Sequence, residues 1–327
     1  MFLKPGGKTA LIWQDAKISY NELLQHIDYF STLFDRNNTN KIAVFSPNRP
    51  EWAYAFYAGW KNDSIVVPID YMAAPDEVAY ILNDCKPEVI FISDDTEPVF
   101  AETEGKLNYA IRAINLDAQN YNFNEYSYGT FPEPDVRKTA VIIYTSGTTG
   151  SPKGVMLSFD NILANIEAVA HEIKIFTPER NVMALLPFHH VFPLIGTLVA
   201  PIFARGTTVF APSMAGEDII ATLQNNHINI IIGVPRLYEA IRKGVMDKIN
   251  ANVVTRFLFK IAKMINSRTF SRKLFKKVHD KFGGKIEFMV CGGAKLNEDI
   301  ALDFKTDRSG ADDHFYPSWQ MENRFGR

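Results

Sequence analysis

The chain has 327 residues, of which 46% are hydrophobic, 13% aromatic and 22% charged, a composition typical of a globular protein rather than a disordered one. Its 35 basic and 37 acidic side chains leave a formal net charge of −2, which argues against bulk binding to nucleic acid. The two cysteines, Cys85 and Cys291, lie far apart, which excludes a disulfide framework and a cysteine-rich zinc site and favours a reducing, cytoplasmic compartment.

Short runs of Val, Ile and Phe alternate along the chain with segments of helical periodicity. Continuous apolar runs indicate strands covered on both faces, so they predict an α/β fold with mainly parallel sheets flanked by helices. The predicted strands are residues 42–47, 64–70, 87–95, 139–145, 181–187, 207–212, 229–235 and 285–294. The predicted helices are residues 51–63, 75–85, 158–173, 217–226 and 297–305, and residues 236–282 are expected to be mostly helical.

The longest apolar stretch covers residues 182–204, and Pro187, Pro193 and Pro201 interrupt it together with two histidines. It therefore predicts strand, loop and buried helix rather than a membrane span. The start of the chain, MFLKPGGKTALIW, lacks the apolar core of a signal peptide. Residues 121–137 are rich in Asn, Tyr, Pro and acidic side chains, and we expect them to form a loop within one fold.

The strongest chemical signal is YTSGTTGSPKGV at residues 144–155, which follows a predicted buried strand. Glycines let a backbone approach a ligand closely, and hydroxyls with one lysine suit a polyphosphate. Pro152 and Gly154 flank Lys153, so the segment is not a Walker P-loop, and no G-x-G-x-x-G occurs. Composition alone would favour a Gly/Ser/Thr-rich surface turn. The candidate phosphate-binding residues are Thr145, Ser146, Gly147, Thr148, Thr149, Gly150 and Lys153.

This string resembles the signature loop of the adenylate-forming (AMP-binding) superfamily, which comprises acyl-CoA synthetases, aryl and luciferase-type ligases and peptide-synthetase adenylation domains. The resemblance covers residues 1 to about 305 and implies the family's larger N-terminal domain, with mainly parallel sheets in two intertwined subdomains. Within this superfamily, the sequence most resembles the long-chain fatty acyl-CoA synthetases.

Three other segments carry the same resemblance and imply further site residues. LPFHHVFPL resembles the family's Leu-Pro-x-x-His segment, which makes His190 the candidate catalytic and acyl-binding residue. IIIGVPRLYEAI resembles the lining of the acyl tunnel, with Val234 in its wall. CGGAKL resembles the segment that borders adenine, so Gly292, Gly293 and Ala294 are candidate nucleotide-binding residues. A hydrogen-bonded core histidine and a strand-end turn are the alternatives for the first and third segments.

The resemblance implies an acid–thiol ligase that uses ATP, Mg²⁺ and coenzyme A. A carboxylate attacks the α-phosphate of ATP to give an acyl-adenylate and pyrophosphate, and a thiol then displaces AMP. Because two anions meet in the first step, positive charge and Mg²⁺ matter more than a protein nucleophile. Aliphatic and aromatic tunnel segments favour a fatty acid over an amino acid, and an aryl or other carboxylate is the alternative. No metal-ligating residue is predicted.

The end of the chain departs from the family pattern. The family's Tyr-Gly-x-Thr-Glu segment and smaller C-terminal domain do not follow residue 305. Codons can be chosen for residues 306–327 so that a neighbouring reading frame opens with Leu-Thr-Glu and continues as family members do. We therefore predict domain 1–305 as a truncated AMP-binding N-terminal domain and residues 306–327 as an aberrant, poorly ordered tail. A frameshift is the favoured origin of this tail, and a genuine novel tail is the alternative.

The sequence leaves two functions open. The chain is either an incomplete, weakly active or inactive fragment of a fatty acyl-CoA synthetase, or a non-catalytic ATP- or acyl-binding module. The basic region 256–281 could make peripheral contact with an anionic membrane surface, and a solvated basic helix face is the alternative. No oligomeric state is predicted.

Overall fold

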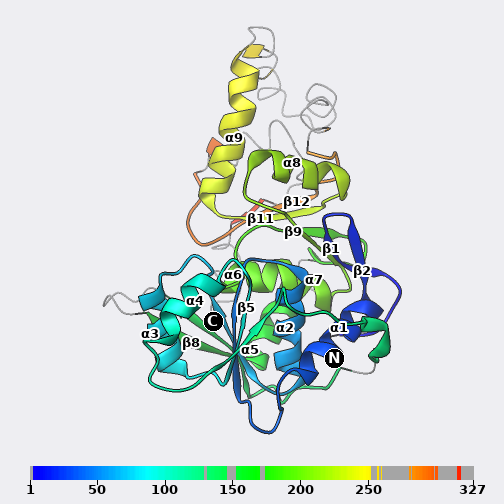
Figure 1. Cartoon of the computed structure of the whole chain (residues 1–327). Helices are drawn as coiled ribbons and strands as arrows, with labels where there is room; N and C mark the ends of the chain where they lie inside the picture. The colour runs from blue at the N-terminus through cyan, green and yellow to red at the C-terminus, as the bar shows by residue number, and fades with distance from the viewer. Residues whose placement is uncertain are drawn as a thin grey trace. The chain divides into compact units, whose positions relative to one another are not determined.

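The computed structural model describes residues 3–128, 131–145, 152–169, 174–251, 256–257, 259, 280, 282–297, 299–300 and 315–317. The chain folds into two units (Figure 1). Unit 1 consists of Met1–Phe176 and Pro187–Arg205, and unit 2 of Thr177–Leu186 and Gly206–Arg327. The chain therefore leaves unit 1, returns to it and leaves it again, and the predicted α/β fold with two intertwined subdomains is confirmed.

Unit 1 is built on a sheet with the strand order β6-β5-β3-β4-β7-β8. All neighbours run parallel except β8, which is antiparallel to β7. The strands are β3 (Lys41–Phe45), β4 (Ile65–Ile69), β5 (Val89–Ile92), β6 (Arg112–Asn115), β7 (Thr139–Thr145) and β8 (Lys153–Ser158). Strands β1 (Thr9–Trp13) and β2 (Ala16–Ser19), which do not belong to this sheet, pair in an antiparallel hairpin.

Helices cover both faces of this sheet. They are α1 (Tyr20–Thr32), α2 (Pro50–Lys61), α3 (Pro75–Cys85), α4 (Glu97–Glu104) and α5 (Phe159–Glu167), followed by the short turns α6 (Val191–Pro193), η3 (Leu194–Val199) and α7 (Ala200–Phe203). Proline at the first helical position begins α2 and α3, where its missing N–H costs nothing. A Cβ on Gly59 of α2 would lie 2.7 Å from side-chain atoms of Ile42 and Val66, so this helix needs glycine to approach the sheet.

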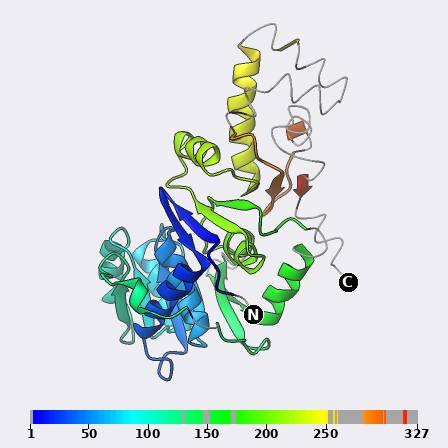
Figure 2. The same ribbon diagram turned by 90° about the vertical axis from the view of Figure 1, so that its right-hand side faces the viewer.

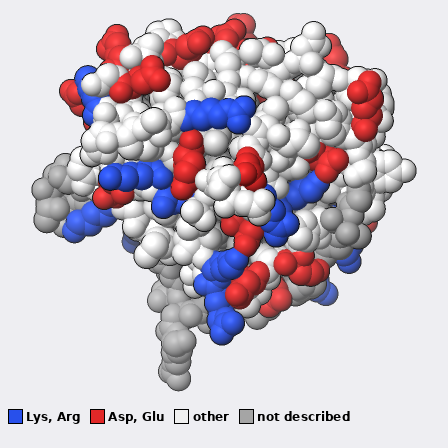
Figure 3. All heavy atoms as spheres, turned by 60° about the horizontal axis from the view of Figure 1, so that its bottom comes forward, with Lys and Arg blue, Asp and Glu red and all other residues white. Residues whose placement is uncertain are grey.

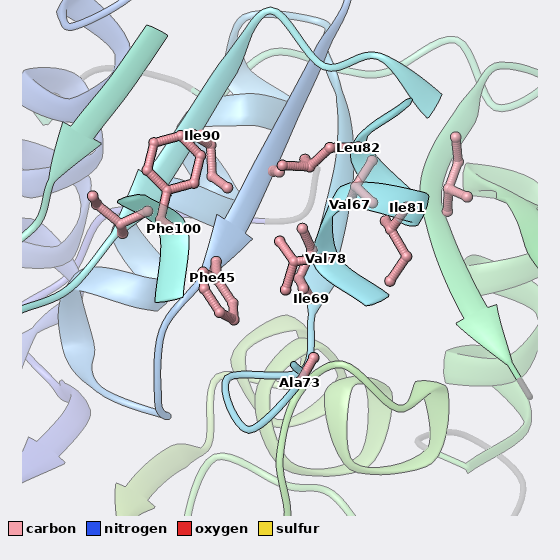
Figure 4. Close-up of a cluster of buried hydrophobic side chains, with 12 residues drawn as sticks. Phe45, Val67, Ile69, Ala73, Val78, Ile81, Leu82, Ile90 and Phe100 are labelled. Atoms are coloured by element: carbon pink, nitrogen blue, oxygen red, sulfur yellow. The ribbon is translucent and has the colours of Figure 1, made fainter. Parts of the chain in front are cut away.

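On the face of the sheet opposite α2, a hydrophobic core lies between the sheet and helices α3 and α4 (Figure 4). Its side chains alternate with those that face α2, as expected for strands buried on both sides. They include Phe45, Val67, Ile69, Val78, Ile81, Leu82, Ile90 and Phe100, none more than 4% exposed. The unbroken apolar character of these strands follows from burial on both faces.

Unit 2 carries parallel strands in the order β13-β12-β11-β9-β10. They are β9 (Asn181–Ala184), β10 (Thr207–Phe210), β11 (Ile230–Gly233), β12 (Phe288–Cys291) and β13 (Phe315–Pro317), and the helices are α8 (Gly216–Asn225) and α9 (Pro235–Asn250). Figures 1 and 2 show α9 running away from the strands after its first turn. That first turn is anchored by Leu237 and Tyr238, which are buried.

Three features of the structure bear on the sequence predictions. Strand β8 lies between the glycine-rich loop and helix α5, where no strand was predicted. Residues 121–137 loop within unit 1, as predicted, and Tyr121 stacks on Tyr29 with 3.6 Å between ring centroids. The predicted poorly ordered tail contains strand β13, and its other residues lie outside those described.

The surface has no large area of one charge on the face drawn in Figure 3, where acidic and basic side chains are interspersed. This pattern agrees with a net charge near zero. Among the described residues, no helix is both long and apolar enough to cross a membrane. Of the basic region 256–281, only residues 256–257, 259 and 280 are described.

Candidate functional site

The glycine-rich segment connects two antiparallel strands of unit 1. Thr145, the last residue of β7, and Lys153, the first of β8, are cross-strand partners, and both are exposed. The structure therefore brings together the two ends of the predicted phosphate-binding segment. Its middle, with the predicted residues Ser146, Gly147, Thr148, Thr149 and Gly150, lies outside the described residues.

Asp70 lies at the same edge of the sheet as Thr145. Strands β4 and β7 run parallel with Val66 opposite Val141. Carrying that register forward by four residues places Asp70 beside Thr145, at the carboxyl edge where ligands of open α/β sheets bind. Asp70 accepts a hydrogen bond from the backbone N–H of Met72 at 3.0 Å, which fixes its carboxylate in a local turn. No sequence motif marks this carboxylate.

Two histidines reach this edge from the segment that follows β9. The Nε2 atom of His189 lies 3.6 Å from Oδ2 of Asp70, and the rings of His189 and His190 are 4.0 Å apart. His189 is half-buried, whereas His190, the residue that the family motif singled out, is exposed at the start of α6. Burial lowers the pKa of His189 to about 4, with a further lowering from His190 that Asp70 opposes.

Polar and aromatic contacts within unit 1 hold the turn that carries these histidines. The backbone N–H of Phe188 donates to the side-chain oxygen of Asn48 at 3.1 Å. The ring of Phe188 meets that of Trp52 edge-on at 4.9 Å, and both rings are almost fully buried. Sequence reasoning missed Asn48, although its position directly after a strand of a parallel sheet is a general signal for a functional side chain.

The remaining predicted residues lie together in unit 2. Val234 and Gly292 directly follow the carboxyl ends of the neighbouring strands β11 and β12. Gly292 donates its backbone N–H to the Gly233 carbonyl at 3.1 Å, and a Cβ on Gly293 would lie 3.6 Å from Cγ1 of Val234. Gly293 has φ +79°, a conformation that favours glycine, and both Gly293 and Ala294 are exposed.

Tyr238 secures these two strand ends, and sequence reasoning did not single it out. Its buried hydroxyl lies 3.0 Å from the Ile231 carbonyl and 2.9 Å from the Val290 carbonyl, so one proton is shared between β11 and β12. Burial raises the pKa of this hydroxyl well above its usual value, which keeps the donor in place. The predicted residues Val234, Gly292 and Gly293 therefore follow two strand ends that Tyr238 ties together.

The described residues offer no ready protein site for a metal. No group of three or more His, Cys, Asp and Glu side chains within the described ranges is arranged to hold a metal ion. Cys85 in α3 and Cys291 in β12 are free thiols. Burial raises the pKa of Cys85 to about 11 and that of Cys291 to about 12, so both are uncharged at neutral pH.

Comparison with known proteins identifies the family. The sequence matches the family described as AMP-binding enzyme over residues 3–315, past the boundary predicted at residue 305. It is 27% identical to the peroxisomal long chain acyl-CoA synthetase 7 of Arabidopsis thaliana over 305 residues, which cover 82% of this chain and 42% of that protein. It is 25% identical to the mitochondrial malonate–CoA ligase of Xenopus laevis over 247 residues, which cover 71% of this chain and 42% of that protein.

Solved structures share the fold. ATP-bound MatB from Rhodopseudomonas palustris superposes with a TM-score of 0.71 at 20% identity, covering 92% of this chain and 55% of that chain. The N-terminal domain of FACL13 from Mycobacterium tuberculosis gives a TM-score of 0.68 at 20% identity, covering 92% of this chain and 70% of that chain. The chain thus spans 42% of the length of the curated relatives named above. Because the family match extends over nearly all of its residues, the chain belongs to the AMP-binding enzyme family.

Proposed function

We propose that this chain binds Mg·ATP and a carboxylic acid and contributes the nucleotide-binding part of an ATP-dependent carboxylate–CoA ligase. The observation that carries the proposal is the family match over residues 3–315. Two separate observations support it: in unit 1, Thr145 and Lys153 are cross-strand partners, and in unit 2, Val234 lies beside Gly293. Exposed Lys153 supplies positive charge for phosphates.

Mg²⁺ enters this proposal as part of the substrate Mg·ATP. The described side chains supply no cluster of ligands for it, so the phosphate oxygens would be its principal ligands. The ion neutralises phosphate charge and makes the α-phosphorus easier for a carboxylate to attack. The protein then has to orient two anions and exclude water, and coenzyme A serves as the second substrate.

We favour a fatty acid as the carboxylate. The relatives include long chain acyl-CoA synthetases of Arabidopsis thaliana and a fatty acyl-CoA synthetase of Dictyostelium discoideum that is 25% identical over 326 residues. Apolar side chains surround the histidine pair in sequence. Met72 and Val191, which follow Asp70 and His189 by two residues each, are 67% and 43% exposed. Exposed apolar side chains of this kind suit an alkyl chain.

A short dicarboxylate is the second candidate. Malonate–CoA ligases of Xenopus laevis and Homo sapiens are 25% and 24% identical to this chain, close to the fatty acid relatives. Arg236, which is exposed in the first turn of α9 two residues after Val234, could pair with a second carboxylate. A fatty acid has only the reacting carboxylate and no second one to pair with Arg236.

Exchange of labelled pyrophosphate into ATP tests the proposal on the full chain, with palmitate, malonate, benzoate or no acid present. Palmitate-dependent exchange supports the fatty acid reading, and malonate-dependent exchange that Arg236→Met abolishes supports the second candidate. Lys153→Ala is expected to weaken exchange, whereas Lys17→Ala, an exposed lysine on β2, is not. Binding of Mg·ATP without exchange would assign a non-catalytic module, and absence of any Mg·ATP binding would overturn the proposal.

A further inference from the structure

We propose that Asp84 and Tyr144 are positioning residues for nucleotide binding, because together they fix the hairpin whose ends are Thr145 and Lys153. The inference rests on the proposed function, which assigns that hairpin to the phosphates of ATP. Asp84 belongs to no recognised motif and lies 60 residues before Tyr144 in the sequence. The structure nevertheless joins the two side chains.

The first step is the hydrogen bond between them. The hydroxyl of Tyr144 donates to Oδ2 of Asp84 at 2.5 Å. Asp84 sits in the last turn of α3, and this helix is anchored on the sheet by the buried side chains of Ile81 and Leu82 (Figure 4). A bond to a carboxylate is stronger than one between neutral groups. Tyr144 is thus tied to an element with little freedom to move.

The second step is the contact between Tyr144 and the facing strand. Tyr144 and Gly154 are cross-strand partners, and the next pair along is Thr145 with Lys153. A Cβ on Gly154 would lie 3.1 Å from Cζ of the Tyr144 ring and 2.9 Å from Cγ2 of Ile142. The backbone of β8 therefore rests directly on this ring, so holding the ring in place holds the pair beyond it.

The third step is that β8 has few anchors besides its antiparallel pairing with β7. It is the edge strand of its sheet, and the first four of its six residues are exposed. Val155 and Met156 are 46% and 67% exposed, so they bury little apolar surface. A hairpin with one weakly packed strand opens locally at low free-energy cost. Beside the backbone pairing with β7, the Tyr144 contact is consequently what fixes the geometry at Lys153.

The Tyr144 hydroxyl remains protonated at neutral pH and can therefore hold its hydrogen bond to Asp84. Burial, and after it the hydrogen bond to Asp84, raises the pKa of Tyr144 far above its ordinary value, so the hydroxyl stays a donor. The neighbouring Cys85 thiol stays uncharged at neutral pH because burial raises its pKa to about 11. We therefore expect the contribution of the pair to nucleotide affinity to be the same at pH 6.5 and pH 8.

Calorimetric titration of the full chain with Mg·ATP and, separately, with palmitate tests the inference. The variants are Tyr144→Phe and Asp84→Asn. The matched control is Tyr29→Phe, which removes a hydroxyl that donates to Gln119 Oε1 at 2.7 Å elsewhere in unit 1. We expect the two variants to weaken the Kd for Mg·ATP by about three- to tenfold and the control to leave it unchanged.

The same titrations separate positioning from general folding. A merely structural role would lower the fraction of chain that binds either ligand, whereas a positioning role changes the Kd for Mg·ATP at unchanged stoichiometry and unchanged palmitate Kd. Variants that bind Mg·ATP with the original Kd overturn the inference and leave the proposed function intact. An unaltered chain that binds no Mg·ATP overturns both. The two variants change different side chains, so if one of them does not fold, the Kd of the other still tests the inference.

Discussion

His26 and His189 are titratable groups that unit 1 holds in their neutral form. The ring of His26 stacks on Tyr54 at 4.3 Å, and its Nδ1 lies 2.6 Å from the Tyr121 hydroxyl. Burial lowers the pKa of His26 from 6.5 to about 4, with Glu22 opposing the shift. Burial and the neighbouring His190 lower the pKa of His189 from 6.5 to about 4 as well.

Because the pKa values of both histidines are lowered, we predict that the free energy of unfolding decreases in mild acid. Their folded pKa values lie below the unfolded value, so the unfolded chain takes up protons first as the pH falls below 6.5. The stability present above pH 6.5 is lost as the pH approaches 4, by about 3 kcal/mol per histidine at most. Urea unfolding at pH 7 and pH 5 measures the loss, and His26→Phe should reduce the difference. An equal difference in both proteins would contradict the assignment of His26.

At the scale of single residues, motif matching identifies some candidate site residues but not the residues around them. His190, Val234 and Gly293 stand in strings that resemble a family, so their numbers could be given in advance. Asp70 and Asn48 could not, because a single Asp or Asn after a strand has no local pattern. Only the parallel register of β4 with β7 and the hydrogen bond to Phe188 reveal them.

At the scale of elements, the seating of α9 on β11 depends on Gly233. A Cβ at this position would lie 2.7 Å from Cδ2 of Leu237 and 3.0 Å from the ring of Tyr238. We expect Gly233→Ala to lower the free energy of unfolding by about 1–3 kcal/mol, because these side chains must shift. Chemical denaturation measures this against Gly105→Ala, where a Cβ meets nothing within 4 Å. Equal stability of the two variants would show that Tyr238 gives way easily.

Sequence patterns predicted the buried strands well and the exposed ones poorly. Residues 139–145 and 75–85 coincide with β7 and α3, because burial on both faces and a proline start leave clear signals. Strand β8 has no such signal, since its pairing with β7 creates it and most of its residues stay exposed. Helix α1 was missed despite a capping box between Ser19 and Glu22, a pattern that the sequence does contain.

At the scale of the molecule, the segment Pro187–Arg205 completes unit 1. Phe188 covers Trp52, and the Tyr20 hydroxyl donates to the Ile202 carbonyl at 3.2 Å. We expect a fragment of residues 1–176 to lack a cooperative unfolding transition, because it leaves these buried groups without partners. Near-ultraviolet circular dichroism during thermal unfolding, compared with a fragment of residues 1–205, measures this. A cooperative transition of the shorter fragment would contradict the expectation.

The end of the chain is the part that remains a prediction. The family match runs to residue 315, and β13 pairs with β12 through Met289 and Phe315, so the strand lies beyond the boundary placed at residue 305. A frameshift from residue 306 is tested by reading the gene in all three frames. Continuation of another frame into family sequence supports it, and a lack of any such continuation contradicts it.

The return of the chain to unit 1 also has a consequence for its synthesis. When Phe176 has left the ribosome, Phe188, the aromatic partner of Trp52, is still 12 residues away (188 − 176), and Arg205, the last residue of unit 1, is 29 residues away (205 − 176). Translation at about 5–20 residues per second makes that delay about 1–6 s. During this interval the nascent chain exposes an aromatic surface that the finished protein buries, which gives a ribosome-associated chaperone time to bind it.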